Sequence, residues 1–289
     1  MEDSVLGIVL AIWASTNLNL GKGLQKWKVK IWGRKGAMFK RENLPDLAIW
    51  CCGLLLTAST MPLLSLAMQN TDKSSMVSAM NGVGLIGLVI FAWLVLKERI
   101  GWRELGGAAL VISGSLIMGW FDKAVEGGQQ YSLNRFLVVV AVIVAVMTPI
   151  AIWSWKTNKL FGLVFGSIPG LCVGVAMILA DMALVKSGNS FTGQLLNPYP
   201  YAAFLLGVAA TVTTQLAFWR SKAMVVIPTF NSLVMLSPLV IEYFTFGISL
   251  QPMQYLGIGI SIGGVIILTA TEKQDRIEGG GRRPEAATA

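Results

Sequence analysis

The sequence predicts an all-α integral membrane protein with nine transmembrane helices, and three observations support this fold class. First, 54% of the 289 residues are hydrophobic and only 13% are charged, which is about half the charged share of a soluble domain. Second, the apolar residues gather in segments long enough to cross a bilayer. Third, the two halves of the chain resemble each other. The acidic start "MEDSVLG" leads straight into an apolar run, so we expect no cleavable signal peptide.

The nine expected spans are about 20 residues long, which is the length that a helix needs to cross the hydrocarbon core. A basic loop at 22–46 follows the first span, and a polar tail at 272–289 has the composition of a disordered segment. The expected spans are 4–21, 47–69, 75–96, 102–121, 136–155, 161–186, 201–219, 223–248 and 252–271.

The basic residues predict the orientation of these spans. Of the 23 lysines and arginines, only Lys73, Lys123, Arg135 and Lys186 fall outside if the N-terminus is outside. The positive-inside rule therefore predicts an outer N-terminus, a cytoplasmic C-terminus and a location in the plasma (inner) membrane. The basic loop serves either as this topological signal or as a binding site for anionic lipid. The net charge of +8 is explained by such loops, so we expect the lipid bilayer and no nucleic acid as a partner.

An internal repeat appears when the sequence is shifted by 150 residues. The segment "LAMQNTDKSSMVSAMN" (66–81) then falls on "LAFWRSKAMVVIPTFN" (216–231). The expected units are a first four-helix repeat (1–121), a connector that contains the fifth helix (122–160) and a second four-helix repeat (161–271). A displacement of five helices is odd, so the units insert with opposite orientation, as in many secondary transporters. The matched residues are Leu66 with Leu216, Ala67 with Ala217, Asn81 with Asn231, Gly107 with Gly257 and Gly114 with Gly264.

Several short motifs resemble a known superfamily. The segment "LVLKERI" (94–100), followed by "GGAALVISGSLIMG" (106–119), resembles the drug/metabolite transporter (EamA-like) superfamily. The segments "NLGKGLQKW" (19–27) and "GRKGAMF" (33–39), with the nine-helix layout, are similar to the NIPA-type magnesium transporter family within it. This resemblance implies a ten-helix-like transporter fold that lacks one helix, with a substrate cavity between the repeats. It also implies a divalent cation, chiefly magnesium, as a candidate cargo.

The eighth span carries a carboxylate where hydrocarbon is expected. A charged side chain there costs about 3 kcal/mol or more, which favours a functional role for Glu242. Asn231, Pro238 and Glu242 share one helical face, and we expect Pro238 to act as a hinge because it removes a backbone hydrogen bond. In the repeat register Glu242 falls on Ala92, so the symmetry of the fold does not require an acid at this position.

The remaining candidate site residues are one acid and three amides. Asp181 in the sixth span is interpreted as a mouth residue, as a salt-bridge partner of Lys186 or as a partner of Glu242. Asn81, Asn17 and Gln215 are either ligands in a central cavity or members of interhelical hydrogen bonds.

Two transport functions follow from these residues. In the first, a carrier moves Mg²⁺, with Glu242 and Asp181 as metal ligands and the amides of Asn231, Asn17 and Gln215 as helpers, because magnesium prefers oxygen ligands. In the second, a proton-coupled exporter moves a small metabolite or drug, and Glu242 carries the proton. A channel or a non-transporting scaffold is the minor alternative.

Catalysis and a resident cofactor are not expected. Histidine is absent from the sequence, and no nucleophile–base pair or phosphate loop is recognisable, which argues against an enzyme. We expect no permanently bound cofactor, Mg²⁺ only as a transported ion, and a small ion or small molecule as substrate. A homodimer is compatible with such a chain.

Overall fold

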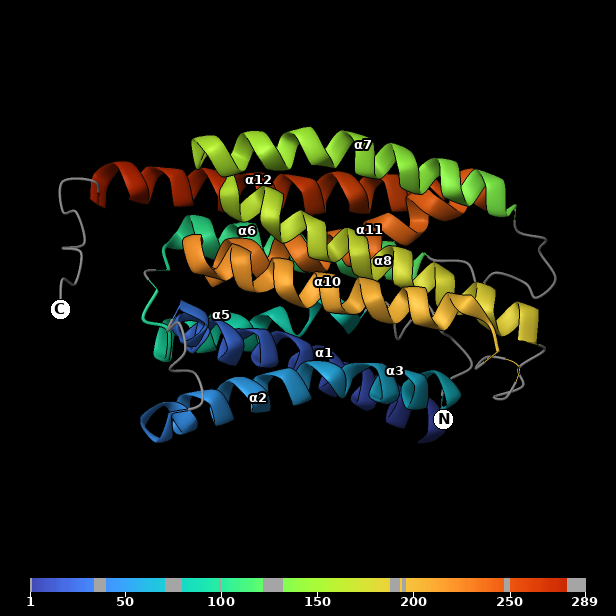
Figure 1. Ribbon diagram of the computed structural model, residues 1–289, viewed down its shortest axis with the longest axis horizontal. Coiled ribbons are helices and arrows are strands. Elements are labelled where there is room, and N and C mark those ends of the chain that lie inside the picture. Colours follow the sequence, from blue (N-terminus) through green and yellow to red (C-terminus); the bar gives the residue numbers. More distant parts are fainter. Residues whose placement is uncertain are drawn as a thin grey trace.

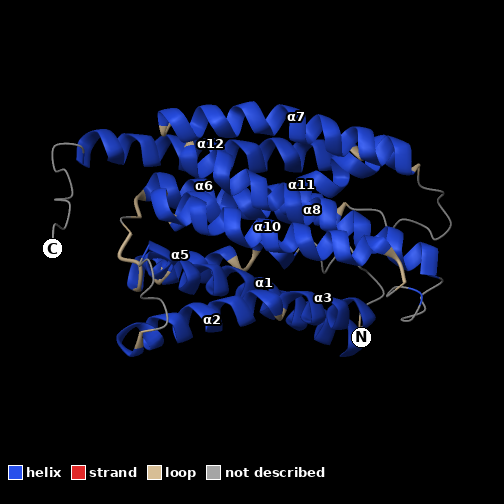
Figure 2. Ribbon diagram, in the orientation of Figure 1, coloured by secondary structure: helices blue, strands red, loops and turns tan. Residues whose placement is uncertain are grey.

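The fold is built of helices that run side by side (Figure 1). A computed structural model describes residues 2–33, 40–70, 80–98, 100–121, 132–187, 193, 196–246 and 250–279. Within these ranges every regular element is a helix, as Figure 2 shows. The helix α1 begins at one end of the bundle, and α12 ends at the other (Figure 1).

The helices keep the order that the hydropathy pattern predicts, with shorter 3-10 turns between some of them. The first half contains α1 (Glu2–Trp27), the 3-10 turns η1 (Val29–Gly33) and η2 (Arg41–Asn43), α2 (Leu44–Ala58), α3 (Thr60–Gln69), η3 (Met80–Gly82), α5 (Leu85–Leu94) and α6 (Trp102–Trp120). The second half follows the connector α7 (Leu133–Thr157) and contains α8 (Phe161–Ser187), α10 (Pro198–Arg220), α11 (Ala223–Phe246) and α12 (Pro252–Gly279).

Seven helical stretches in the described part of the chain are long and apolar enough to cross a membrane. The protein is therefore an integral membrane protein, as the sequence predicts. The expected span at 75–96 is represented by α5, whose ten residues are too few to cross alone, and residues 71–79 lie outside the described part. The helix α6 begins with Arg103 and Glu104 and is also not among the seven. Nine complete spans thus remain a prediction.

Three helix groups organise the packing. The helix α1 packs on α2, α3 and α5, the helix α8 packs on α10 and α11, and α6 packs on α12. In Figure 1, α1, α2 and α3 lie along one edge of the bundle, α7 and α12 lie along the other, and α8 and α10 lie between them. The largest buried apolar cluster joins the halves, with Leu85, Leu88 and Val111 on one side and Phe218 and Val226 on the other.

The contact between α6 and α12 is reciprocal. A Cβ atom on Gly107 would lie 3.0 Å from the Gly264 carbonyl oxygen, and one on Gly264 would lie 2.6 Å from the Gly107 carbonyl oxygen. Gly114 and Gly257 make the second such pair, at 2.6 and 2.9 Å. The repeat register matches Gly107 with Gly257 and Gly114 with Gly264. Gly107 therefore contacts the repeat counterpart of Gly114, and Gly114 contacts the repeat counterpart of Gly107. This crossing is the arrangement that a two-fold axis between the helices requires. The inverted repeat as a whole remains a prediction.

Two helices extend by six residues or more beyond their predicted C-terminal ends. The helix α1 continues to Trp27, so Lys22 and Lys26 lie in a helix and not in the expected basic loop 22–46. At the other end, α12 continues to Gly279 into the segment predicted to be disordered. That extension, "EKQDRIE", is composed mostly of good helix formers, which prolong an existing helix at little cost. The final residues, 280–289, lie outside the described part.

Glycines explain why α1 does not end at residue 21. A Cβ atom on Gly21 would lie 2.6 Å from the carbonyl oxygen of Gly53 in α2, and one on Gly23 would lie 2.8 Å from the ring of Phe91 in α5. Both glycines therefore serve close helix packing, which is common between membrane helices. Their presence on either side of Lys22 brings this part of α1 into the centre of the first half.

Candidate functional site

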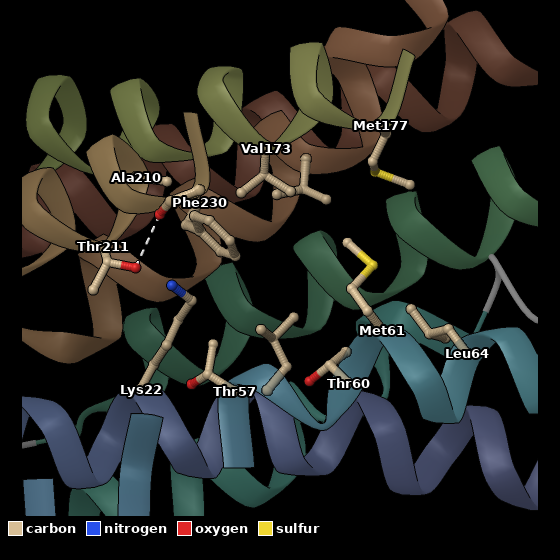
Figure 3. A pocket seen from close by; sticks show the side chains of 13 residues that line it. Lys22, Thr57, Thr60, Met61, Leu64, Val173, Met177, Ala210, Thr211 and Phe230 are labelled. Atoms are coloured by element: carbon tan, nitrogen blue, oxygen red, sulfur yellow. Dashed lines mark hydrogen bonds between the residues drawn. The ribbon is translucent and has the colours of Figure 1, made fainter. Parts of the chain in front are cut away.

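A cavity of about 170 Å³ lies between the two halves of the chain (Figure 3). Its walls come from α1, α2 and α3 on one side and from α8, α10 and α11 on the other. The lining residues are Leu18, Lys22, Thr57, Thr60, Met61, Leu64, Val173, Met177, Gly207, Ala210, Thr211, Phe230 and Val234.

Lys22 is the charged residue of this lining. It follows Leu18 by one helical turn, so both side chains leave α1 on the same face. Figure 3 shows Lys22 projecting from α1 toward Phe230 and Thr211. Only 5% of Lys22 is exposed, and its Nζ atom lies 3.7 Å from the centroid of the Phe230 ring. This is a cation–π contact between the two halves.

No carboxylate in the described part of the chain lines the cavity beside Lys22. The salt bridge of this region is Lys28 with Asp46, at 2.6 Å, and it lies beyond the end of α1. A buried ammonium group is costly to desolvate unless an opposite charge or a set of hydrogen-bond acceptors compensates it. The face of the Phe230 ring supplies part of this compensation. The rest of the positive charge can be compensated by an anion that enters the cavity.

The hydroxyl groups of the cavity already donate to backbone carbonyls. Thr57 donates to the Gly53 carbonyl at 2.9 Å, and Thr211 donates to the Gly207 carbonyl at 3.0 Å. The remaining lone pairs of these hydroxyls can accept hydrogen bonds. The free donor capacity of the lining is therefore concentrated on Lys22.

The rest of the lining is apolar. Met61 and Leu64 come from α3, Val173 and Met177 from α8, and Val234 from α11. Methionine side chains are unbranched and adapt to ligands of different shape. A cavity with one charge and an adaptable apolar wall suits a small organic molecule.

A chain of side-chain hydrogen bonds through two glutamine amides lies beside the cavity, toward the C-terminal end of α1. Trp50 Nε1 donates to Gln215 Oε1 at 3.1 Å, and Gln215 Nε2 donates to Gln25 Oε1 at 2.6 Å. Gln25 Nε2 then donates to Thr57 Oγ1 at 3.1 Å. This chain joins α1 and α2 of the first half to α10 of the second half. Gln215, which the sequence singled out as a candidate ligand, is thus occupied with interhelical bonding.

The next turn of α1 ties the two halves at their helix ends. Lys26 Nζ donates to the Phe218 carbonyl and, at 2.6 Å, to the Ser221 carbonyl, which are at the C-terminus of α10. A cation at this position also interacts favourably with the helix dipole.

Glu98 makes the complementary contact at the start of α11. Its carboxylate accepts the backbone N–H of Ala223 at 2.8 Å and of Met224 at 3.2 Å. Burial raises the pKa of Glu98, while these two N–H groups and the charges of Lys26 and Lys222 act in the opposite direction. Lys26 and Glu98, which we call the end clasp, therefore hold both sides of the turn between α10 and α11.

An amide pair joins α1 and α11 deeper in the bundle. Asn231 Nδ2 donates to Asn19 Oδ1 at 2.8 Å, and Asn19 Nδ2 donates to the Ser15 carbonyl at 2.8 Å. Asn231 Oδ1 is buried and has no hydrogen-bond partner among the residues that the structure describes. Asn17 instead donates to Ser59 Oγ at 3.2 Å, so Asn17 and Asn19 point to different faces of α1.

None of the predicted site residues whose side chains the structure describes lines the cavity. Glu242 is half-buried on α11 and is absent from the lining, to which α11 contributes Phe230 and Val234. Pro238 lies within α11, which continues through it as a helix to Phe246. The side chains of Asp181 and Asn81 lie outside the described part. The role of each of these residues remains a prediction.

Sequence reasoning missed Lys22 because it placed this residue in a loop. The signal that could have found it is the spacing of Leu18, Lys22 and Lys26, which continues the helical face of α1. No group of three or more metal-ligating acids, cysteines or histidines gathers among the residues that the structure describes.

A second cavity, of about 280 Å³, lies between α6, α8, α11 and α12. Apart from Ser232 and Ser261, whose hydroxyls bond each other at 2.9 Å, its lining is apolar. It lacks a charged group and therefore offers less basis for selecting a ligand than the cavity at Lys22.

Comparison with known proteins supports a transporter domain. Residues 4–120 match the EamA-like transporter family, which agrees with the superfamily resemblance of the sequence motifs. A UPF0324 membrane protein of Fusobacterium nucleatum subsp. nucleatum is 26% identical over 124 residues, which are 42% of this chain and 35% of that protein. The chain thus spans about a third of the length of this curated relative. No solved structure matches.

Proposed function

We propose that the protein is a secondary transporter that moves a small organic solute by alternating access through the cavity at Lys22. The observation that carries this proposal is a cavity between the two halves of the chain. Among the residues that line it, Lys22 is the one with a charged side chain. The match of residues 4–120 to the EamA-like transporter family supports the transporter class. It leaves the substrate to be argued from the site.

Alternating access requires two halves that can rearrange around a fixed site. The crossed glycine contacts of α6 and α12 support a two-fold relation between the halves, which provides two similar packings. The amide chain at Gln215 and the end clasp of Lys26 and Glu98 join the halves on one side of the cavity. These contacts break and reform between the two packings.

The magnesium hypothesis rests on Glu242 and Asp181, as the sequence predicts. Mg²⁺ binds through one or two carboxylates and keeps several waters. The cavity at Lys22 is lined by a lysine where a magnesium site needs a carboxylate. An ammonium group repels a divalent cation. This charge favours the organic solute over magnesium. Proton coupling through Glu242 remains compatible with either cargo.

Transport by the purified protein in vesicles tests the proposal. Mg²⁺ entry is followed with an indicator dye inside the vesicles, and counterflow is measured for radiolabelled carboxylates, organic phosphates, amino acids and amines. We expect counterflow of at least one organic class and no Mg²⁺ entry above that of protein-free vesicles. Mg²⁺ entry that Glu242→Gln and Asp181→Asn abolish, without organic counterflow, would establish the magnesium hypothesis instead.

The orientation belongs to the same proposal. We infer an outer N-terminus and a cytoplasmic C-terminus in the plasma (inner) membrane, because the basic loops then lie inside. This places the end clasp, at the end of α1, on the cytoplasmic side. Labelling of Asp3→Cys in intact cells by an impermeant maleimide, after replacement of Cys51, Cys52 and Cys172, checks the orientation. Absence of labelling until the cells are opened would reverse it.

A further inference from the structure

We propose that Lys22 binds an anionic group of the transported solute, so that the substrate is a small organic anion with an apolar body. This inference deepens the proposed function, on which it rests, by assigning the chemical class of the cargo. The shared chemistry is a carboxylate or a phosphate group attached to an apolar portion of about the size of one ring. Neither the family match nor the sequence motifs assign a role to Lys22.

The first argument is electrostatic. Lys22 is 5% exposed and faces a cavity, while its charge has no carboxylate partner in the described part of the chain. Its contact with Phe230, at 3.7 Å from the ring centroid, compensates part of the desolvation cost. An anion that enters the cavity supplies the missing opposite charge, and the low dielectric of the surroundings strengthens the pair.

The second argument is the balance of hydrogen-bond donors. An ammonium group has three donors and no acceptor. The hydroxyls of Thr57 and Thr211 already donate to backbone carbonyls, so they offer no donor to the cavity. A carboxylate or phosphate accepts from Lys22 and also neutralises its charge, whereas a neutral carbonyl only accepts and a cation is repelled.

The third argument is size and shape. An engineered apolar cavity of about 150 Å³ is large enough to bind benzene. The cavity at Lys22 has about 170 Å³ and can therefore hold a solute of one ring. Met61, Val173 and Met177 line it away from the charge and can contact an apolar body. Phe230 forms the wall beside the ammonium group, so it can contact both parts of the solute. The site thus has one polar end and one apolar end.

The neighbouring lysine makes the assignment specific to Lys22. Lys26 lies one turn further along α1, but two carbonyls at the end of α10 accept from its ammonium group. Lys28 pairs with Asp46 and lies outside the cavity. Lys22 is therefore the lysine of α1 whose charge is available to a solute.

A charge series on one ring tests the inference with purified full-length protein in a neutral detergent. The probes are benzoate, phenyl phosphate, the neutral benzamide and the cationic benzylamine, and binding is read from the shift of the thermal transition. We expect at least one of the two anions to bind ten times more tightly than benzamide and benzylamine. Lys22→Met should remove this preference, and Lys22→Arg should keep most of it.

The controls separate the loss of a charge from the loss of the fold. Lys28→Met removes a positive charge from the same region and should keep the preference for anions. Lys22→Gln provides a second neutral variant, and gel filtration reports whether each variant is monodisperse. Equal binding of anions and benzamide, or a preference that survives both Lys22→Met and Lys22→Gln, overturns the inference.

Flux distinguishes failure of the inference from failure of the proposed function. Phenyl phosphate crosses lipid slowly by itself because its charge must be desolvated, so its counterflow in phosphatidylcholine vesicles reports the protein. These vesicles hold no anionic lipid, so a preference lost on addition of phosphatidylglycerol would assign Lys22 to a lipid headgroup and overturn the inference. An anion preference in binding without any counterflow would support the site and contradict the transport function.

Discussion

Lys22 and Lys26 lie one turn apart on α1 but have opposite surroundings. The ammonium group of Lys26 is held by the carbonyls of Phe218 and Ser221 at the end of α10. That of Lys22 faces a cavity and the ring of Phe230. Residue type and helix are the same, so the difference comes from the partner helix. Where α10 ends, its carbonyls lack intrahelical partners and bind a cation; where α10 continues, they do not. One lysine therefore stabilises the interface and the other remains available.

Replacing each lysine with methionine is expected to separate these two roles most strongly. Lys26→Met leaves buried carbonyls without their donor and should lower stability by about 3 kcal/mol, because hydrogen bonds to charged groups are among the strongest. Lys22→Met removes an incompletely compensated charge and should leave stability unchanged or raised. Thermal unfolding of both variants in the same detergent measures the difference. An equal loss in both would show that Lys22 is also a structural anchor.

The amide chain between these lysines is expected to give the next largest effect. Gln215→Leu leaves Trp50 Nε1 and Gln25 Oε1 without their partners, and an unsatisfied buried group costs about 1–3 kcal/mol. The matched control is Thr213→Val on the same helix, whose hydroxyl bonds only its own backbone. Thermal unfolding should place Gln215→Leu clearly below this control. Equal midpoints would mean that the chain contributes little to the contact between the halves.

The sequence predicted the order of the helices well, because hydropathy depends mainly on local composition. It failed at the end of α1 for a physical reason. Glycine on both sides of Lys22 is typical of a loop, and a lysine is costly in hydrocarbon. In the folded protein Gly21 packs on Gly53 and Gly23 packs on Phe91, and these tertiary contacts stabilise the helix. Contacts between distant segments are not visible in local composition.

The glycines of α6 and α12 show the opposite case. Sequence self-comparison matched Gly107 with Gly257 and Gly114 with Gly264, and all four glycines contact the opposite helix in the structure. The match identified which residues matter, but not that the pairs would cross. A repeat register states equivalence, whereas contact depends on where the symmetry axis lies. For the same reason it could not predict that Gln215 and Asn231 would bond across the halves to Gln25 and Asn19.

The end clasp predicts a modest dependence of stability on pH. Burial raises the pKa of Glu98 above its ordinary 4.5, so the folded protein holds this proton more tightly than the unfolded chain does. The contribution of Glu98 to stability is therefore greatest below pH 4.5 and is lost as pH rises through the raised pKa. Glu98→Gln should flatten the decline of the thermal midpoint as pH rises above about 4.5, by an amount on the order of 1 kcal/mol for each pKa unit. The same decline in protein and variant would assign it to other groups.

The smallest expected effect concerns the acid that the sequence made most prominent. Glu242 does not line the cavity, so Glu242→Gln should change phenyl phosphate counterflow by less than about threefold, or about 0.6 kcal/mol. Lys22→Met, measured beside it, should abolish that counterflow. If instead the glutamine variant loses counterflow and the methionine variant keeps it, the comparison between the lysines no longer describes the transport site. Uptake of phenyl phosphate driven by a pH gradient sharpens the result. If Glu242 carries a coupled proton, Glu242→Gln should reduce this uptake and leave counterflow unchanged.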